Sequence, residues 1–338
     1  MQYPEREFKT EIKGEEAVDE GAAIIRGGGL VAFPTETVYG LGADAFNAEA
    51  VKSIFLAKGR PQDNPLIVHI PSAEWLPTVA KTVPPEAYEL FNRFSPGPLT
   101  IVLPKADRLP LVTTAGLQTV GIRIPNSKIA RELIARSGTP IAAPSANRSG
   151  RVSPTTAMDV YEDMAGRIPL ILDGGDTDVG IESTVITLAG AVPTVLRPGA
   201  VTIEMLSEVL GTVVNHKGKV VVAEAPGMKY KHYAPIVPCV GAADPVVAAE
   251  KAISVGNAAV VGSTPFVQAA KEAGATVIDI GSTPDECMRN AFKTLRLAEK
   301  RFGFLVIEHF EGKPGYYALN NRLNKSYGGN VIGKKEKE

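Results

Sequence analysis

The sequence predicts an α/β protein with two domains, and three observations support this prediction. The chain has 338 residues, which exceeds the usual size of a single domain. Its first part contains short apolar runs, such as residues 30–33, that end in polar loops, as buried strands of an α/β sheet do. From Ile236 onward, strand-like and helix-like segments alternate regularly, which predicts a small parallel, doubly wound sheet.

Periodicity and end signals place the elements of the first part. Residues 15–26 form an amphipathic helical pattern that stops at a run of glycines, and the strand at 30–33 follows. Asn47 is a good N-cap for a helix that runs to Lys58 and ends at Gly59. Further strands are expected at 66–70, 99–103, 120–124, 140–143, 169–173, 182–186 and 193–196, and further helices at 84–94, 127–136, 155–164 and 201–210.

The second part follows a linker and has the alternating pattern. Residues 224–235 combine prolines, a glycine and charged side chains, as linkers do. We therefore predict a first domain over 1–211, a linker over 212–235 and a small Rossmann-like parallel α/β domain over 236–338. In that last domain, strands are expected at 237–240, 258–261, 276–280 and 304–307, and helices at 244–254, 265–273 and 284–300.

The composition excludes several classes of protein. Hydrophobic residues make up 44% and charged residues 22%, as in ordinary globular domains. The formal net charge of -1 argues against a polycation that holds nucleic acid by charge alone. Cys239 and Cys287 are the only cysteines, so we expect a reducing, cytoplasmic location without a disulfide framework. The sequence has neither a signal-peptide pattern nor an apolar run of about 18 residues, so we expect no membrane contact.

Familiar nucleotide and metal motifs are missing. No G-x-x-x-x-G-K-[ST] pattern occurs, which disfavours a P-loop. Two loose glycine patterns, which begin at Gly27 and Gly40, do not lie between a strand and a helix as a dinucleotide loop requires. Four histidines without close spacing disfavour a zinc site.

The loop at residues 33–42 carries more polar groups than a turn needs. Thr35, Glu36, Thr37 and Tyr39 follow the strand at 30–33, and ligands of open α/β sheets collect at the carboxyl ends of strands. We therefore expect this loop to form one wall of a small-molecule site. Tyr39 is either part of that wall or a packing residue. Glu36 either helps to hold a metal ion, whose ligands stay unknown, or pairs with Lys58, Arg60 or Arg123.

Four cations stand on loops or strand ends of the same part: Lys58, Arg60, Arg123 and Arg197. Each also has a purely structural interpretation, because the first two would complement a helix dipole and the other two would pair with buried carboxylates. His69 lies on an apolar strand and, considered alone, is more typical of a packed core histidine. Likewise, Ser145, Asn147 and Ser153 would serve simply to satisfy a loop backbone.

Together, these groups match the needs of a triphosphate and a small polar co-substrate. Nucleotidyl transfer requires charge neutralisation and positioning more than a protein nucleophile. The chain has no Ser-His-Asp or Cys-His arrangement, which agrees with that chemistry. We expect no catalytic nucleophile and assign charge stabilisation to Lys58 and Arg60.

A series of ordered motifs then resembles the YrdC family over about residues 12–210. The motifs are FPTETVYGLG at 33–42, KGRP at 58–61, NPL at 64–66, PGPLT at 96–100, RIP at 123–125, PSANRSG at 144–150, EST at 182–184 and LRPG at 196–199. The KHYAP segment at 231–235 and the domain after it resemble the longer, two-domain members of that family. This resemblance implies a twisted, mixed-sheet first domain with a cationic concavity, joined by a linker that covers the site.

The resemblance also implies a reaction and its site residues. L-threonine, bicarbonate and ATP would give threonylcarbamoyl-AMP and pyrophosphate, with Mg²⁺ accompanying ATP. Threonine would be held by Thr35, Thr37, His69, Arg123 and Ser183, and which of the two threonines makes the contact stays open. ATP would be held by Lys58, Arg60, Asn64, Thr119, Ser145, Asn147, Ser153, Arg197 and Tyr233. Tyr233, with Lys231 and His232, would cover the bound nucleotide.

The implied product serves threonylcarbamoyladenosine formation in tRNA, through a separate transferase complex and with a possible weak contact to tRNA. Three alternatives stay open. One is a non-catalytic RNA- or nucleotide-binding, translation-associated module. The second is a carbamoyl-transfer protein of hydrogenase maturation, which would need cysteine clusters that this chain lacks. The third is a regulator that binds ATP and ignores threonine.

Overall fold

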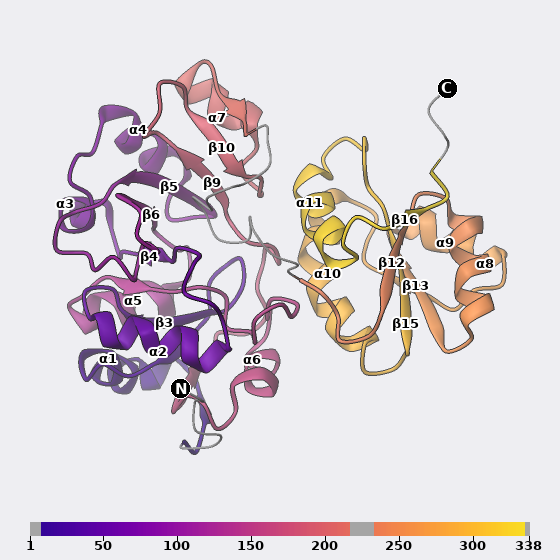
Figure 1. Ribbon diagram of the computed structural model, residues 1–338, viewed down its shortest axis with the longest axis horizontal. Helices are drawn as coiled ribbons and strands as arrows, with labels where there is room; N and C mark the ends of the chain where they lie inside the picture. Colours follow the sequence, from indigo (N-terminus) through magenta and orange to yellow (C-terminus); the bar gives the residue numbers. More distant parts are fainter. Residues whose placement is uncertain (1–7, 217–232, 335–338) are drawn as a thin grey trace. The chain divides into compact units, whose positions relative to one another are not determined.

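The computed structural model describes residues 8–216 and 233–334. The chain forms two compact units, which are considered separately (Figure 1). The first unit comprises residues 1–149, 154–178 and 182–230. The second comprises 150–153, 179–181 and 231–338, so two short segments from the first half of the chain belong to the second unit. The linear division predicted from sequence does not contain this exchange, and most of its linker lies outside the described residues.

A mixed sheet of 11 strands forms the first unit, in the order β1-β8-β2-β3-β7-β4-β6-β5-β9-β10-β11. The sheet contains both parallel and antiparallel strand pairs: β4 and β6 are parallel, for example, whereas β5 and β6 are antiparallel. The predicted mixed-sheet α/β class is therefore confirmed. The strands are β1 Glu11–Lys13, β2 Val31–Phe33, β3 Gly40–Asp44, β4 Ile67–His69, β5 Leu99–Pro104, β6 Thr119–Arg123, β7 Ile141–Ala142, β8 Leu170–Leu172, β9 Thr184–Thr187, β10 Thr194–Arg197 and β11 Val214–Asn215.

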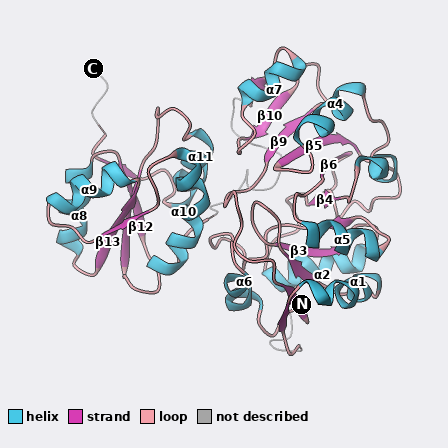
Figure 2. Ribbon diagram, turned by 180° about the vertical axis from the view of Figure 1, so that it is seen from behind, coloured by secondary structure: helices cyan, strands magenta, loops and turns pink. Residues whose placement is uncertain are grey.

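Both faces of this sheet are buried, which explains the continuous apolar runs in its strands. In β2, Val31 and Phe33 enter one hydrophobic cluster with helices α1 and α5, whereas Ala32 enters a second cluster with α2 and α4. Figure 2 shows α1 and α5 beside each other in this unit. The helices are α1 Val18–Arg26, α2 Ala48–Lys58, α3 Leu76–Val79, α4 Pro85–Phe94, α5 Lys128–Ser137, α6 Ala157–Met164 and α7 Ile203–Leu210, with short 3-10 turns at Glu15–Ala17 and Ala73–Trp75.

Helix α2 ends where the local sequence rules place its ends. The Asn47 side chain accepts hydrogen bonds from the N–H groups of Glu49 and Ala50. At the other end, Gly59 adopts a left-handed conformation with φ 61°, which glycine tolerates without strain. The last residue of the helix is Lys58, so these two caps fix the position of a predicted site residue.

Six of the helices and strands that the structure describes were not predicted from the sequence. Strand β3 is the most important, because the loop expected over 33–42 ends at Gly40, where the chain turns back antiparallel to β2. Its sequence, GLGAD, has no β-branched residue, and a Cβ on Gly42 would lie 2.7 Å from side-chain atoms of Ile141 and Phe33. The strand therefore depends on close packing rather than on local propensity. The other five elements are β1, α3, β11, α11 and β16.

The second unit contains a five-stranded sheet in the order β14-β13-β15-β12-β16, in which every pair is parallel. This confirms the predicted doubly wound domain. Helices α8 and α9 lie on one face of the sheet and α10 and α11 on the other (Figure 1). The strands are β12 Cys239–Ala242, β13 Ala258–Gly262, β14 Val277–Asp279, β15 Phe304–Glu308 and β16 Val331–Ile332, and the helices are α8 Pro245–Val255, α9 Thr264–Glu272, α10 Pro284–Ala298 and α11 Tyr317–Ser326.

Within residues 8–216 and 233–334, none of the helices has both the length and the apolar character needed to cross a membrane.

Candidate functional site

Sheet register aligns several predicted site residues across the first unit. His69 on β4 pairs with Arg123 on β6, and Arg123 pairs with Thr100 on β5. Thr100 pairs in turn with Val185 on β9, which pairs with Arg197 on β10. These residues therefore form one transverse row across five neighbouring strands. Directly paired residues project from the same face of a sheet, so the row brings together polar side chains from distant parts of the chain.

Arg123 of this row forms a buried ion pair with Glu36, which lies on the loop after β2. Arg123 is 4% exposed and Glu36 is 7% exposed. The Arg123 Nη2 atom lies 2.8 Å from Glu36 Oε1, but the angle is not that of a hydrogen bond. The Nε and Nη2 donors of Arg123 consequently have no hydrogen-bond partner. The other Glu36 oxygen, Oε2, accepts the backbone N–H of Asn126 at 3.0 Å.

The structure shows which of the three expected cations pairs with Glu36. Glu36 pairs with Arg123 and not with Lys58 or Arg60. Among the described residues, no group of three or more His, Cys, Asp or Glu side chains is arranged to hold a metal ion.

His69 is buried beside Arg123 and remains a neutral imidazole. Its ring packs edge-to-face on Phe33, with ring centroids 6.0 Å apart. Burial and, to a smaller extent, the neighbouring Arg123 charge together lower the pKa of His69 to about 3. The Nδ1 atom has no hydrogen-bond partner. A role in core packing therefore explains the position of the His69 ring but does not explain why Nδ1 is buried without a hydrogen-bond partner.

Thr100 and Arg197 of the row form a second buried cluster with Ser183, which lies just before β9. The Ser183 and Thr100 hydroxyl groups are 2.8 Å apart. Arg197 donates from Nη2 to Ser183 Oγ at 3.1 Å and from Nε to the Ser183 carbonyl at 3.0 Å. A residue predicted to contact threonine, Ser183, is thus held directly by one predicted to contact ATP, Arg197.

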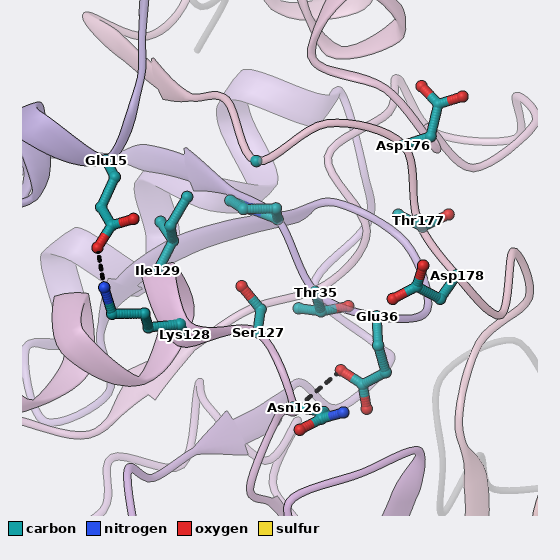
Figure 3. Close-up of a pocket in the computed structure, with 12 residues that line it drawn as sticks. Glu15, Thr35, Glu36, Asn126, Ser127, Lys128, Ile129, Asp176, Thr177 and Asp178 are labelled. Atoms are coloured by element: carbon teal, nitrogen blue, oxygen red, sulfur yellow. Dashed lines mark hydrogen bonds and ion pairs between the residues drawn. The ribbon is translucent and has the colours of Figure 1, made fainter.

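The loop after β2 lines a cavity of about 260 Å³ (Figure 3). Thr35 and Glu36 lie on one side with Asn126 and Ser127, and the segment 176–178 lines the cavity as well. The Thr35 hydroxyl donates its proton to the Val38 carbonyl at 2.6 Å. Its 2.9 Å contact with the Thr37 hydroxyl is therefore donated by Thr37. Thr35 lines the cavity, whereas Thr37 is fully buried beneath it.

Tyr39 is a packing residue that fixes one edge of this cavity. Its side chain is fully buried, and burial raises the pKa of its phenol. The hydroxyl donates to the Gly175 carbonyl at 2.7 Å and accepts the Gly174 N–H at 3.1 Å. The turn held in this way leads directly into the cavity-lining segment 176–178.

Lys58 joins the end of α2 to the loop at 144–149. Only 2% of Lys58 is exposed, and its ammonium group donates to the carbonyls of Ser145 and Asn147. The Ser145 hydroxyl donates to Asn147 Oδ1 at 2.5 Å. The backbone of this loop is also held against the loop after β2, because Ala146 N–H donates to the Tyr39 carbonyl at 2.8 Å. The structure therefore brings Lys58, Ser145 and Asn147 together.

Six predicted ATP contacts lie outside this cluster, of which Arg197 has been described with Ser183 and Tyr233 follows below. Arg60 donates to the Asn64 carbonyl at 3.3 Å, and Asn64 is 1% exposed. Ser153 is 1% exposed. Thr119 begins β6, at the opposite end from Arg123 and about 13 Å along the strand at about 3.3 Å per residue.

Tyr233 belongs to the second unit, and its ring stacks on Phe292 with centroids 5.4 Å apart. Its predicted contact with the nucleotide stays a prediction. Lys231 and His232, named with it as parts of a cover, lie outside the described residues.

Sequence reasoning missed three residues at the site. Thr100 lies in the PGPLT motif but had no assigned role, although its register position beside Arg123 places it there. Asn126 contributes a backbone N–H, which no side-chain pattern reveals. Thr177 is 5% exposed, lines the cavity and has a hydroxyl without a hydrogen-bond partner.

Comparisons with known proteins bear on this site. The sequence model of a family described as "Telomere recombination" matches residues 23–199, and a model described as "Threonylcarbamoyl-AMP synthase, C-terminal domain" matches residues 201–328. The threonylcarbamoyl-AMP synthase of Pyrococcus abyssi (strain GE5 / Orsay) is 46% identical over 325 residues, which cover 92% of this chain and 94% of the relative. The protein of that name from Bacillus subtilis (strain 168) is 43% identical over 325 residues, 93% of this chain and 94% of the relative.

A solved structure described as P. abyssi Sua5 complexed with L-threonine superposes on the chain with a TM-score of 0.88. It is 43% identical, and the alignment covers 96% of this chain and 98% of that one.

Proposed function

The chain belongs to the Sua5/YrdC family of threonylcarbamoyl-AMP synthases, and on that premise we propose how its first unit carries out the reaction. The chain is a nucleotidyltransferase that forms threonylcarbamoyl-AMP and pyrophosphate from L-threonine, bicarbonate and ATP. A non-catalytic RNA- or nucleotide-binding role therefore does not describe it. The assignment of its residues to the two substrates is our proposal.

The observation that supports the threonine site is the unsatisfied guanidinium of Arg123. A buried charged donor without a partner is costly, so such groups are normally hydrogen-bonded. Here Nε and Nη2 both lack a partner, although Glu36 lies beside them. Adjacent donors of a guanidinium fit the two oxygens of a carboxylate. We assign Arg123 to the carboxylate of threonine, with Glu36 holding the guanidinium in place.

The surrounding groups suit the rest of the amino acid. Thr35 lines the cavity, and the hydroxyl of Ser183 contacts that of Thr100, the neighbour of Arg123 in the row, so we assign both hydroxyls to the amine or hydroxyl of threonine. His69 is neutral and keeps Nδ1 without a partner, which suits a hydrogen bond to a substrate more than a charge contact. Thr37 acts indirectly in this assignment, because its hydroxyl supports that of Thr35.

The nucleotide side is assigned to the cations and the loop at 144–153. Lys58, Arg60 and Arg197 would neutralise phosphate charge, and Ser145, Asn147, Asn64, Thr119 and Ser153 would supply polar contacts. Mg²⁺ would enter with ATP, because this ion usually binds through substrate phosphates and one or two carboxylates at most. Its role would be to stabilise charge on the departing pyrophosphate.

The reaction has two steps, and the nucleophile of each step, first the threonine amine and then a carbamate oxygen, comes from the substrates. The threonine amine adds to CO₂ or bicarbonate and forms a carbamate, with water released when bicarbonate is the source. A carbamate oxygen then attacks the α-phosphorus of ATP, the bond from that phosphorus to the bridging oxygen breaks, and pyrophosphate leaves. By holding the threonine carboxylate and the phosphates, the protein residues place the carbamate oxygen in line with the bond that breaks, and they exclude water from a labile adenylate.

We further propose that the product passes to a threonylcarbamoyl transferase complex for tRNA modification, with at most a weak contact of this chain to tRNA. The cytoplasm is the location that suits such a product. The linker over 212–235 is proposed to cover the bound nucleotide, with Tyr233 as a contact. Truncation before Ala225 tests that role, which is wrong if the truncated protein keeps its full product yield.

Product analysis after incubation with ATP, threonine and bicarbonate, omitting each in turn, tests the assignment of substrates. We expect threonylcarbamoyl-AMP and an equal amount of pyrophosphate only when all three are present. Pyrophosphate release that needs neither threonine nor bicarbonate would contradict the proposal.

A further inference from the structure

The two short segments that belong to the second unit flank proposed site residues in the sequence. Residues 150–153 directly follow the loop with Ser145 and Asn147, and they include Ser153. Residues 179–181 precede Ser183, with only Glu182 between them. Both segments lie against helix α10 of the second unit, which makes this helix the common feature of the two.

The last turns of α10 hold the first segment through two buried charged side chains. Arg296 is 1% exposed and donates to the Val152 carbonyl from Nε at 3.2 Å and from Nη2 at 2.6 Å. The Glu299 side chain is 2% exposed and accepts from Arg151 at 2.8 Å. The same carboxylate accepts the Ile236 N–H at 2.8 Å. Val152, whose carbonyl receives both donors, immediately precedes Ser153.

A fork of two donors on one carbonyl fixes the orientation of that peptide as well as its position. Packing alone would be achieved at least as well by an apolar side chain, because burying a guanidinium carries a large desolvation cost. Arg296 therefore contributes something that a leucine or methionine would not, namely a defined place for the 152–153 peptide. The planar geometry of its donors makes this contact sensitive to replacement by lysine.

The second segment meets α10 by close backbone contact. Gly180 has φ +78°, and a Cβ at this position would lie 2.5 Å from the Arg289 carbonyl oxygen and 2.6 Å from the Arg289 Cα. Contacts of this length are not tolerated, so any side chain would displace the segment from the helix. Glu182 and Ser183 follow at once, and Ser183 is held by Arg197 and Thr100.

We propose that Arg296 and Gly180 are positioning residues for the synthase reaction: Arg296 sets the nucleotide loop through Val152, and Gly180 sets the Ser183 contact to threonine. This inference rests on the proposed assignment of Ser153 to ATP and Ser183 to threonine. It gives helix α10 a role in substrate binding although neither residue need touch a substrate.

The two positions act on different substrates, which separates positioning from a general loss of stability. Arg296→Gln removes the fork and is expected to raise the KM for ATP about tenfold, since small displacements of a binding group have effects of this order or larger. The KM for threonine should change less than about twofold. Gly180→Ala should give the reverse pattern, with the larger rise in the KM for threonine.

Steady-state kinetics of the full-length protein, with each substrate varied at saturation of the other, provides the test. Arg301→Gln is the matched control, because Arg301 is exposed three residues after the end of α10 and should leave both constants unchanged. Arg296→Lys keeps the charge with a single donor group, and it should fall between wild type and Arg296→Gln in the KM for ATP. Thermal unfolding of each variant is measured in parallel.

The outcomes separate the possibilities. Unchanged constants in Arg296→Gln and Gly180→Ala would overturn the proposal. So would an equal rise of both KM values that follows the loss of thermal stability, because that pattern needs only a structural role; if Arg296→Gln does not fold, Arg296→Lys decides in its place. If the wild-type protein forms product without ATP or without threonine, it is the proposed function that fails, independently of these variants.

Discussion

Two buried charged side chains, one in each unit, are satisfied to different degrees. In the first unit, Arg123 is almost fully buried, and its Nε and Nη2 donors have no hydrogen-bond partner. In the second unit, Glu308 is fully buried, and both of its oxygens are satisfied, Oε1 by Lys313 and Oε2 by the Ser263 N–H at 2.6 Å. An unsatisfied buried donor requires an explanation such as a ligand, whereas the charge of Glu308 is fully accounted for by its partners in the fold. The difference therefore supports a binding role for Arg123 and a structural role for Glu308.

The comparison also explains why burial alone does not identify a site. Arg123 and Arg296 are both buried arginines, with exposures of 4% and 1%. The Nε and Nη2 atoms of Arg296 both donate to the Val152 carbonyl, whereas the Nε and Nη2 atoms of Arg123 have no hydrogen-bond partner. Variants of Arg123 and of Glu308 should accordingly affect different measurements, threonine kinetics for Arg123 and stability for Glu308.

Arg123→Lys should have the largest effect. Lysine keeps a positive charge beside Glu36 but loses the paired donors for a carboxylate, so kcat/KM for threonine should fall about 100-fold, the equivalent of about 3 kcal/mol for charged hydrogen bonds. Initial rates at limiting threonine measure this change. Arg136→Lys is the control, because Arg136 is 45% exposed and its partners on the surface are Asp19 and Glu132. A variant with normal threonine kinetics would remove Arg123 from the substrate site.

Glu308→Ala should give the opposite result in the second unit. It leaves the Ser263 N–H without its acceptor and opens a small cavity, so the free energy of unfolding should fall by about 2 kcal/mol. The Lys313 pair adds little to this figure, because that side chain is 43% exposed and solvent screens it. Denaturant unfolding measures the change, and substrate kinetics well below the transition should match those of wild type. A loss of activity without a loss of stability would break the comparison.

His69→Gln tests whether the buried imidazole is neutral in the folded state. The pKa of His69 is lowered from 6.5 in the unfolded chain to about 3 in the folded protein. Between these two pH values, the unfolded chain binds a proton at His69 and the folded protein does not. Stability of the wild type relative to His69→Gln should therefore fall as the pH falls from 6.5 towards 3, by about 1 kcal/mol between pH 6 and pH 5.

Unfolding curves of both proteins at the two pH values measure this difference. His216→Gln serves as the control, because His216 is exposed and lies outside the row. A pH-independent difference between wild type and His69→Gln would mean that the folded protein accepts the proton.

Tyr39→Phe should have the smallest effect. It removes the hydroxyl that holds the 174–175 turn and leaves the Gly174 N–H without an acceptor, so stability should fall by about 1 kcal/mol. Because that turn leads into the cavity, the KM for threonine should rise slightly. Tyr88→Phe is the control, because Tyr88 is an exposed residue of α4, and it should leave both values unchanged. A wild-type melting temperature for Tyr39→Phe would show that the hydroxyl contributes nothing to the turn.

Much of the fold follows from local sequence. The caps of α2 at Asn47 and Gly59, the apolar strands and the alternating pattern after Ile236 depend on residues within a few positions of each other. Those local rules failed for β3, whose glycines form a strand only because β2 and β7 lie beside it. They failed as well for α11, whose sequence is largely polar outside Ala318, Leu319 and Leu323.

The sequence by itself determined the types of residue at the site: a carboxylate and hydroxyls after the first strand, four cations on loops and strand ends, and no nucleophile. Only the tertiary structure decided which of them meet. It paired Glu36 with Arg123, placed Thr35 rather than Thr37 at the cavity, and aligned His69, Arg123 and Thr100 in one row. The reason is physical, since sheet register and side-chain packing join residues tens of positions apart, and no local preference encodes such pairs.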